Sequence, residues 1–159
     1  MTDADENHLR RAIELAASAL EAGSLPFGSL LVGPEGDVLA KRRNTAVPDR
    51  DITAHPELKL ARWAARELDV DTARRTTMYT SCQPCPMCAG AIARSGLGRI
   101  VYALSSEQIG GLKPPAIVIP ERPEAANEGP ALFAEARVPV DAYYAYLEAS
   151  GNTRTHRFD

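Results

Sequence analysis

The sequence has few cysteines, few aromatic residues and no long apolar segment. Of its 159 residues, 3 are cysteine and 6% are aromatic. No apolar run approaches the roughly 20 residues that a membrane-spanning helix requires, so we expect no membrane association. The first ten residues are polar and acidic, whereas a secretory signal begins with basic residues and continues with an apolar stretch. We therefore expect a cytoplasmic protein.

Neither sign of charge dominates the sequence. It has 18 Lys and Arg against 21 Asp and Glu, a formal net charge of −3. The basic segments at 41–43 and 74–75 have aspartates close by in the sequence, which indicates a mixed, solvated surface. Proteins that bind a phosphate backbone usually carry a basic face, so a nucleic-acid partner is not expected. The charge balance favours a small-molecule substrate.

Hydrophobic periodicity predicts helices and strands that alternate along the chain. Such alternation is typical of a three-layer α/β/α fold around a mixed sheet, and we expect residues 1–159 to form a single domain of this class with five strands. The predicted helices span residues 5–22, 56–68, 84–95 and 132–149, the last one broken at Pro139. The predicted strands span residues 29–33, 38–40, 76–80, 99–103 and 116–119. Residues 105–115 and 120–130 are predicted as loops and residues 150–159 as a flexible tail.

Two short motifs, at residues 55–57 (HPE) and 84–88 (PCPMC), each open a predicted helix. The second motif places two thiols three residues apart on one face of a helix start, where the helix dipole is expected to lower thiol pKa values. One histidine and two cysteines make three ligands, and three protein ligands with a position left for water are typical of catalytic zinc. We therefore predict that His55, Cys85 and Cys88 bind Zn²⁺.

Glu57 is the predicted catalytic residue. It lies two residues after His55, so its carboxylate can stand beside the metal without binding it. Zinc lowers the pKa of a water molecule toward about 7, which makes the water a nucleophile at neutral pH. From beside the metal, Glu57 can take a proton from that water and deliver it to the substrate.

Cys82 leaves two alternatives open. All three cysteines lie within seven residues, and Cys82-x-x-Cys85 overlaps the second motif. Clustered cysteines in a reducing compartment favour metal or redox chemistry over disulfide staples. Cys82 as a fourth ligand would close the metal site and make it structural, and a redox pair of Cys82 with Cys85 would leave His55 and Glu57 without a role.

The motifs resemble those of the cytidine deaminase superfamily, in the branch of guanine deaminases, fungal-type cytosine deaminases and tRNA adenosine deaminases. The H-x-E and P-C-x-x-C pair is the signature of zinc deaminases. The resemblance extends over residues 8–103, and segments 26–28, 51–57 and 79–92 carry it. Segment 79–92 is most similar to bacterial guanine deaminases. The resemblance implies a cytidine deaminase-like fold, zinc at the starts of two helices, and a homodimer.

The resemblance also implies an activity and further site residues. It implies a hydrolytic deaminase that uses water to release ammonia from a free heterocyclic base, namely a guanine-like purine, a cytosine-like pyrimidine or an aminotriazine. Asn44 is implied to hydrogen-bond the base, and Phe27, Ala54 and Pro84 to contact it. As plainer alternatives, Asn44 is a turn residue and Phe27 belongs to the core.

The sequence departs from the family pattern in three places. Pro56 stands where the branch usually has Ala, and Gln83 stands where it commonly has Glu. Beyond Ala103 the resemblance fades, and no basic C-terminal helix of the kind expected of a tRNA deaminase follows. A tRNA adenosine deaminase shares every motif residue and stays open as an alternative, as does a structural zinc or redox module.

Overall fold

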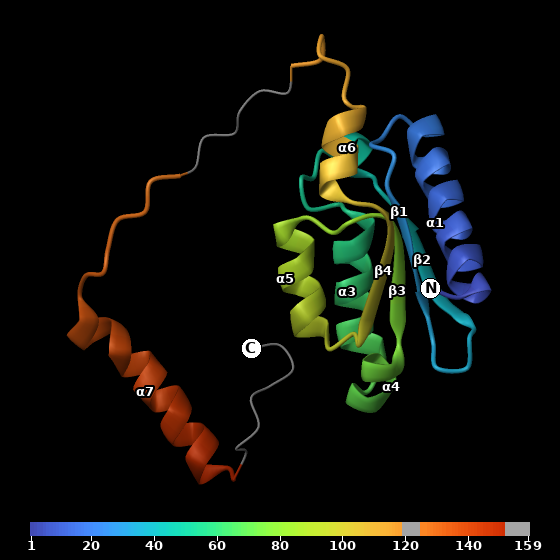
Figure 1. The fold of residues 1–159 in the computed structure, drawn as a ribbon. Helices are drawn as coiled ribbons and strands as arrows, with labels where there is room; N and C mark the ends of the chain where they lie inside the picture. Colours follow the sequence, from blue (N-terminus) through green and yellow to red (C-terminus); the bar gives the residue numbers. More distant parts are fainter. Residues whose placement is uncertain (119–124, 152–159) are drawn as a thin grey trace. The chain divides into compact units, whose positions relative to one another are not determined.

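We describe the protein from a computed structural model, which defines residues 1–118 and 125–151 (Figure 1). The chain divides into two units, one from Met1 to Pro114 and one that begins at Pro115. The elements of the first unit are α1 (Asp3–Glu21), β1 (Gly28–Val32), β2 (Val38–Arg43), α2 (Ala46–Asp49), α3 (Pro56–Glu67), α4 (Val70–Arg75), β3 (Thr77–Cys82), α5 (Pro86–Ser95), β4 (Arg99–Leu104) and α6 (Ser106–Leu112). The second unit contains α7 (Phe133–Ala149).

The four strands form one mixed sheet in the order β2-β1-β3-β4. β1 is antiparallel to both of its neighbours, and β3 runs parallel to β4. Every residue of β1 is buried, as expected of an apolar strand covered on both faces. Helix α1 covers one face of the sheet, and α3 and α5 cover the other (Figure 1). The predicted three-layer α/β/α class is therefore confirmed.

Each face of the sheet has its own apolar core. Under α3 and α5, the buried side chains are Leu31, Leu60, Ala61, Ala64, Met78 and Ile92. Under α1, they are Leu9, Ala12, Leu30, Val32 and Tyr79. Neighbouring residues of β1 and of β3 thus serve opposite cores, because successive side chains of a strand point to opposite faces.

Helix α1 lies unusually close to the first residue of β1. A Cβ atom on Gly28 would be 2.5 Å from Leu15 Cβ and 2.6 Å from the carbonyl oxygen of Ala12. Glycine is therefore the residue that lets the backbones of α1 and β1 approach this far. The N–H of Gly28 also donates to the Ser81 hydroxyl at 3.1 Å, so the same residue ties β1 to the end of β3.

The fifth predicted strand is absent from the described residues. Residues 116–118 are irregular, and Ile119 lies outside the described range. A short apolar run is compatible with several backbone states, and its periodicity alone does not settle which one forms. The predicted loop at 105–115 is also wrong in part, because α6 occupies most of it. Its start is stabilised by a reciprocal pair of hydrogen bonds between Ser105 and Gln108.

Helix α7 is continuous, so the predicted break at Pro139 is wrong. A proline within a helix removes one backbone hydrogen bond and strains the turn before it, and here the helix continues to Ala149. Residues 125–130 of the predicted loop at 120–130 are irregular, whereas residues 120–124 and most of the predicted tail at 150–159 lie outside the described residues. The single domain stays a prediction. Among the described helices, none combines the length and apolar character needed to cross a membrane.

Candidate metal centre

Two helix starts on the same face of the sheet carry the predicted ligands. His55 is the N-cap of α3 and Cys85 is the N-cap of α5, both with extended backbone. A proline follows each of them at the first helical position, where its missing N–H costs no hydrogen bond. Since α3 and α5 pack side by side, the two starts meet. Pro56, where the family usually has Ala, therefore suits its position.

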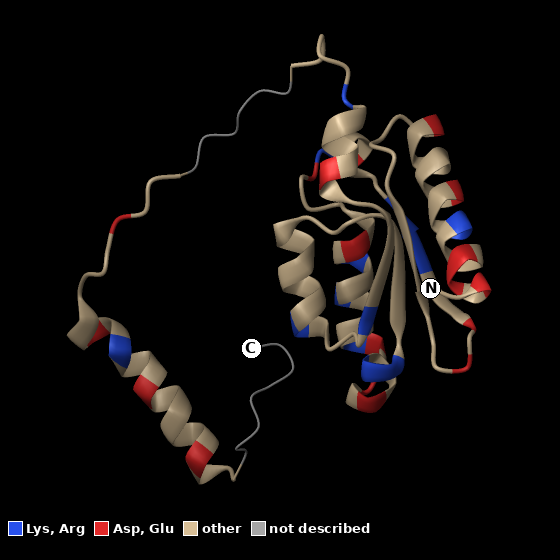
Figure 2. Cartoon of the chain, viewed as in Figure 1, with Lys and Arg blue, Asp and Glu red and all other residues tan. Residues whose placement is uncertain are grey.

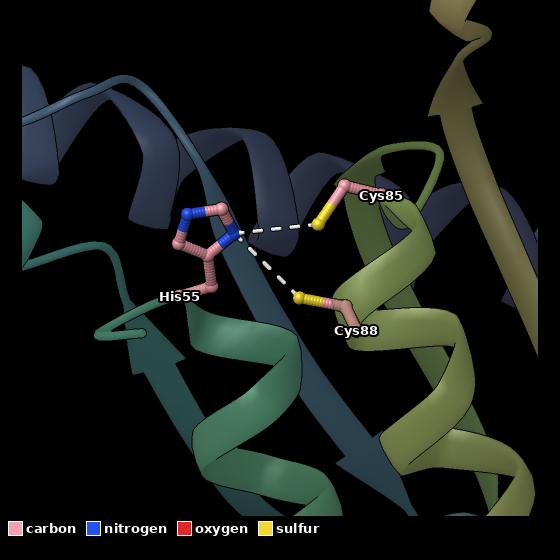
Figure 3. A group of neighbouring side chains, drawn as sticks. All are labelled: His55, Cys85 and Cys88. Atoms are coloured by element: carbon pink, nitrogen blue, oxygen red, sulfur yellow. Dashed lines mark hydrogen bonds between the residues drawn. The ribbon is translucent and has the colours of Figure 1, made fainter. Parts of the chain in front are cut away.

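The structure brings His55, Cys85 and Cys88 together. Their ligand atoms all lie within 4.8 Å of one another. The His55 Nδ1 atom is 3.8 Å from Cys85 Sγ and 3.6 Å from Cys88 Sγ (Figure 3). Tetrahedral zinc with ordinary Zn–N and Zn–S bonds holds nitrogen and sulfur ligands about 3.6 Å apart. The two nitrogen–sulfur distances are therefore close to those that a bound zinc ion requires.

Cys82 is not a member of this group. It is buried at the end of β3, and burial raises the pKa of its thiol. All three cysteines are free thiols. The closed site of one histidine and three cysteines is thus not formed by these side chains, and the geometry favours an open site with three ligands.

The Cys88 thiol has a pKa above its ordinary value, against the expectation from the helix dipole. Burial is the main cause, and the nearby Glu57 carboxylate and Cys85 add to it. Burial disfavours the thiolate more strongly here than the helix start favours it. A cation bound beside Cys88 would favour the thiolate form that binds zinc.

Glu57 is buried, and hydrogen bonds hold it in place. Its Oε1 accepts from the Thr80 hydroxyl at 3.0 Å, and the Ser29 hydroxyl donates to Thr80 at 2.8 Å. Its Oε2 lies 3.8 Å from Cys88 Sγ, beside the ligand group. One carboxylate oxygen is thus anchored to the sheet while the other faces the position of the metal. Thr80 and Ser29 face each other across β1 and β3, a contact that no local motif reveals.

A pocket of about 270 Å³ opens at the ligand group. Glu57 and two of the three ligands line it, together with residues that precede β1, lie at and just after the end of β3, and belong to α5 and α6. Its lining residues are Phe27, His55, Glu57, Cys82, Gln83, Cys85, Pro86, Ser106 and Ile109. Phe27 is among these residues, and its contact with a substrate stays a prediction. Ser106 and Ile109 were not predicted to contribute because their segment was expected to be a loop, although Ser105-x-x-Gln108 is a helix-start pattern.

The other predicted substrate contacts do not line this pocket. Asn44 is fully buried, and its Oδ1 accepts from the Ser24 hydroxyl and the Ala46 N–H, each at 2.9 Å. Its Nδ2 is buried without a partner among the described residues. Asn44 is thus a turn residue with a spare donor. Ala54 is buried, and its carbonyl accepts from the Thr45 N–H, while Pro84 is half-buried.

A larger hollow of about 680 Å³ lies elsewhere, between α1 and β2. Its charged lining is mixed, with Arg11, Lys41 and Arg42 beside Glu14. Figure 2 shows the same mixture of acidic and basic residues along α1. This hollow has no set of metal ligands and no nucleophile, so the chemistry of the side chains, rather than volume, identifies the smaller pocket as the candidate site.

The chain belongs to the family described as the cytidine and deoxycytidylate deaminase zinc-binding region, whose model matches residues 2–104. This match covers α1 to β4 and therefore every candidate ligand. The resemblance to this family and its zinc cofactor are thereby confirmed, and the family's fold agrees with the layers of the first unit.

Relatives of this chain include deaminases of different kinds. It is 36% identical over 112 residues to a probable cytosine deaminase of Schizosaccharomyces pombe, covering 69% of this chain and 65% of the relative. It is 37% identical over 99 residues to guanine deaminase of Bacillus subtilis (62% and 63%) and 33% identical over 108 residues to a tRNA-specific adenosine deaminase of Haemophilus influenzae (68% and 62%). The matches span less than two thirds of each of these relatives.

A solved structure of guanine deaminase from Bacillus subtilis resembles this chain over nearly its whole length. The TM-score is 0.69 at 27% identity, with 98% of this chain and 99% of that chain covered. The cytidine deaminase-like fold predicted from the motifs is confirmed by this match, apart from the strand that the described sheet lacks.

Proposed function

We propose that this protein is a zinc-dependent hydrolase that removes an exocyclic amine from a free nucleobase or a close analogue. One observation carries the proposal: His55, Cys85 and Cys88 form a zinc-sized ligand group, and the buried carboxylate of Glu57 lies beside it in a pocket. The relatives from Schizosaccharomyces pombe and Bacillus subtilis are named as a probable cytosine deaminase and a guanine deaminase, which supports the same class of reaction.

The ligand set leaves the metal open to water. Three protein ligands are one fewer than a closed structural zinc site has. When bound, zinc supplies a Lewis acid that lowers the pKa of a water molecule toward about 7. His55, Cys85 and Cys88 hold the ion at the mouths of α3 and α5, and the anchored Glu57 carboxylate points to the same place.

Glu57 then moves protons between water and the base. It accepts a proton from the attacking water and delivers it to the ring nitrogen next to the carbon that bears the amine. The second water proton travels by the same carboxylate to the leaving amine. A carbon–oxygen bond forms, the carbon–nitrogen bond breaks, and ammonia leaves while the ring keeps a carbonyl group. Water and base supply every atom, and no oxidant or reductant is needed.

The pocket favours a free base over a nucleotide. Its volume of about 270 Å³ is at the lower limit of ordinary small-molecule sites. None of its lining residues is Lys or Arg, so it offers no cation to a phosphate group. Phe27 supplies an aromatic face for a flat ring. Guanine-like, cytosine-like and aminotriazine rings remain the proposed substrate classes.

The test is ammonia release by zinc-loaded protein from guanine, isoguanine, adenine, cytosine, 5-azacytosine, ammeline and the matching nucleosides. We expect turnover of at least one free base, and a loss of about 10²- to 10⁴-fold in Glu57→Gln with zinc content unchanged. Activity that survives this substitution would overturn the role of Glu57. A structural zinc module predicts no turnover in either protein.

The chain is 33% identical to a tRNA-specific adenosine deaminase, which supports a second candidate function, the deamination of adenosine in tRNA. No release from any free base, together with inosine formation in an adenosine-containing tRNA, would favour it. Such an RNA complex should weaken steeply as salt is raised, because phosphate contacts release counterions. The homodimer and the cytoplasmic location stay predictions.

A further inference from the structure

Gln83 follows β3 and precedes the ligand Cys85, and it contacts both the end of β4 and the start of α6. Its backbone N–H donates to the Leu104 carbonyl at 2.8 Å, which joins the segment after β3 to the end of β4. Its side-chain Oε1 accepts from the Ser106 N–H at 3.0 Å, which joins the same segment to the first residue of α6. Gln83 also lines the pocket, and no other lining residue has a side-chain amide.

The Ser106 contact determines which end of the Gln83 amide is free. A backbone N–H is a donor, so the atom that pairs with it must be the amide oxygen. The NH2 group, with two donor hydrogens, is therefore the end left for a ligand in the pocket. A glutamate at this position would accept from Ser106 equally well, but its second oxygen would present an acceptor and a negative charge.

The remaining polar groups of the pocket make this donor distinctive. Glu57 is a carboxylate, and His55 and Cys85 are committed to the metal group. Phe27, Pro86 and Ile109 supply apolar surface. The Ser106 hydroxyl can donate or accept, so it does not discriminate between the two. The Cys82 thiol is only a weak donor. The Gln83 NH2 group is therefore a donor that cannot also accept, at the rim of a pocket whose other polar groups are acceptors or can act as either.

We propose that Gln83 is a specificity-determining residue, which donates to an acceptor on the edge of the base that faces α6 and thereby selects oxo-substituted bases over their amino-substituted counterparts. The inference rests on the proposed function, since it assigns a substrate feature to the same pocket. Gln83 is exposed in the free protein, and a base that fills the pocket would cover its NH2 group, so a mismatched partner would leave both groups without a hydrogen bond.

The test measures binding rather than turnover. Zinc-loaded Glu57→Gln protein is titrated by calorimetry with two matched pairs, guanine with 2,6-diaminopurine and cytosine with 2,4-diaminopyrimidine. Each pair exchanges a ring carbonyl for an amine. Within the pair that binds, we expect the ratio of oxo to amino affinity to fall about tenfold when Gln83→Glu is added. Gln83→Met, which lacks both the donor and a charge, should move the ratio in the same direction.

Gln108→Ala is the matched control. It removes one of the two hydrogen bonds that stabilise the start of α6, the one from the Ser105 N–H to the Gln108 side chain. Gln108 does not line the pocket, so a general loosening of α6 should leave the ratio unchanged. Equal ratios, within twofold, in the Gln83 variants and the parent would overturn the proposal, as would failure of both pairs to bind. Ammonia release is measured separately, on protein that keeps Glu57. If ammonia is released but the ratio of oxo to amino affinity is unchanged, only the role of Gln83 is overturned. A shifted ratio without release supports Gln83 and overturns the deaminase.

Discussion

Two clusters of polar side chains in the unit from Met1 to Pro114 differ in how completely their members find hydrogen-bond or charge partners within the cluster. In the Asp5 cluster, formed by Asp5, Tyr79 and Arg99, the carboxylate accepts from Tyr79 Oη at 2.7 Å and from two Arg99 nitrogens at 2.7 and 3.0 Å. The Thr2 N–H donates to it as well, at 2.8 Å. Both oxygens of the Asp5 carboxylate therefore have hydrogen-bond partners within the protein.

The metal cluster, formed by His55, Glu57, Cys85 and Cys88, lacks what the Asp5 cluster has. It contains two thiols and a carboxylate but no Lys or Arg. In the same unit, the buried Nδ2 of Asn44 has no partner among the described residues. Buried polar groups normally find partners within the protein. A complete cluster holds α1 against β3 and β4, whereas an incomplete one marks the place where a ligand is expected.

The largest effect should follow from removing a metal ligand. Cys88→Ala leaves two ligands, and we expect its zinc affinity to fall by more than about 100-fold, with loss of ammonia release. Cys82→Ala is the matched control, because its thiol lies outside the ligand group and zinc should stay bound. Metal content measured by atomic emission after dialysis tests both. Full zinc loss in Cys82→Ala would contradict the ligand assignment.

The next effect concerns Asn44, which the family resemblance implies to hydrogen-bond the base and whose buried Nδ2 has no partner among the described residues. Asn44→Ala removes Nδ2, and we expect a rise in KM of about 10- to 100-fold with zinc content unchanged. Ser24→Ala removes one partner of Asn44 Oδ1 but keeps Nδ2, so it should lower stability with a much smaller change in KM. Steady-state kinetics on the preferred base decide this, and unchanged kinetics in Asn44→Ala would assign Asn44 to the turn alone.

Breaking the complete cluster should affect stability instead of chemistry. Asp5→Asn removes the charge that Arg99 pairs with, and since Arg99 is half exposed we expect a loss of about 1–2 kcal/mol in unfolding free energy. Hydrogen bonds from Arg99, Tyr79 and Thr2 lower the pKa of Asp5 below its ordinary value of 3.8. A lowered pKa stabilises the folded protein above that value.

The pH dependence of Asp5→Asn follows from this sign. Above about pH 4 the difference between Asp5→Asn and the parent protein should be constant, and it should shrink as the pH falls below 4. Urea unfolding at pH 7, 4 and 3 measures it. A difference that grows toward acid pH would contradict the role of the Asp5 carboxylate.

The smallest effect should come from the hydroxyl that holds Glu57. Thr80→Val keeps the shape of the side chain but removes the donor to Glu57 Oε1, and we expect kcat to fall about tenfold with zinc retained. Ser29→Ala acts one hydrogen bond further away and should lower kcat less. If both variants keep the parent kcat, the carboxylate is positioned by other contacts.

The parts of the site that could be predicted are those with local signals. His55, Glu57 and Cys85 stand at helix starts next to prolines, and Cys88 lies in the first turn of α5, so both their spacing and their chemistry are visible within a few residues. Phe27 was found through the family resemblance. Structure adds the contacts that depend on strand register, such as Thr80 with Glu57, which join residues far apart in the sequence.

Each error in the fold prediction has its own physical cause. Gly110 and Gly111 disfavour a helix, so α6 was predicted as a loop, although its cap between Ser105 and Gln108 outweighs them. Pro139 was given too much weight in α7. Residues 116–118 are apolar enough for a strand, but apolarity does not provide the neighbouring backbone that a strand pairs with.

The close contact at Gly28 has a consequence for anyone who engineers this protein. Its neighbours are Ser29, whose hydroxyl begins the chain of hydrogen bonds to Glu57, and Phe27, which lines the pocket. Even a methyl group at position 28 would meet the backbone of Ala12 and push α1 and β1 apart. Libraries that seek new substrates should therefore vary Phe27 and leave Gly28 untouched.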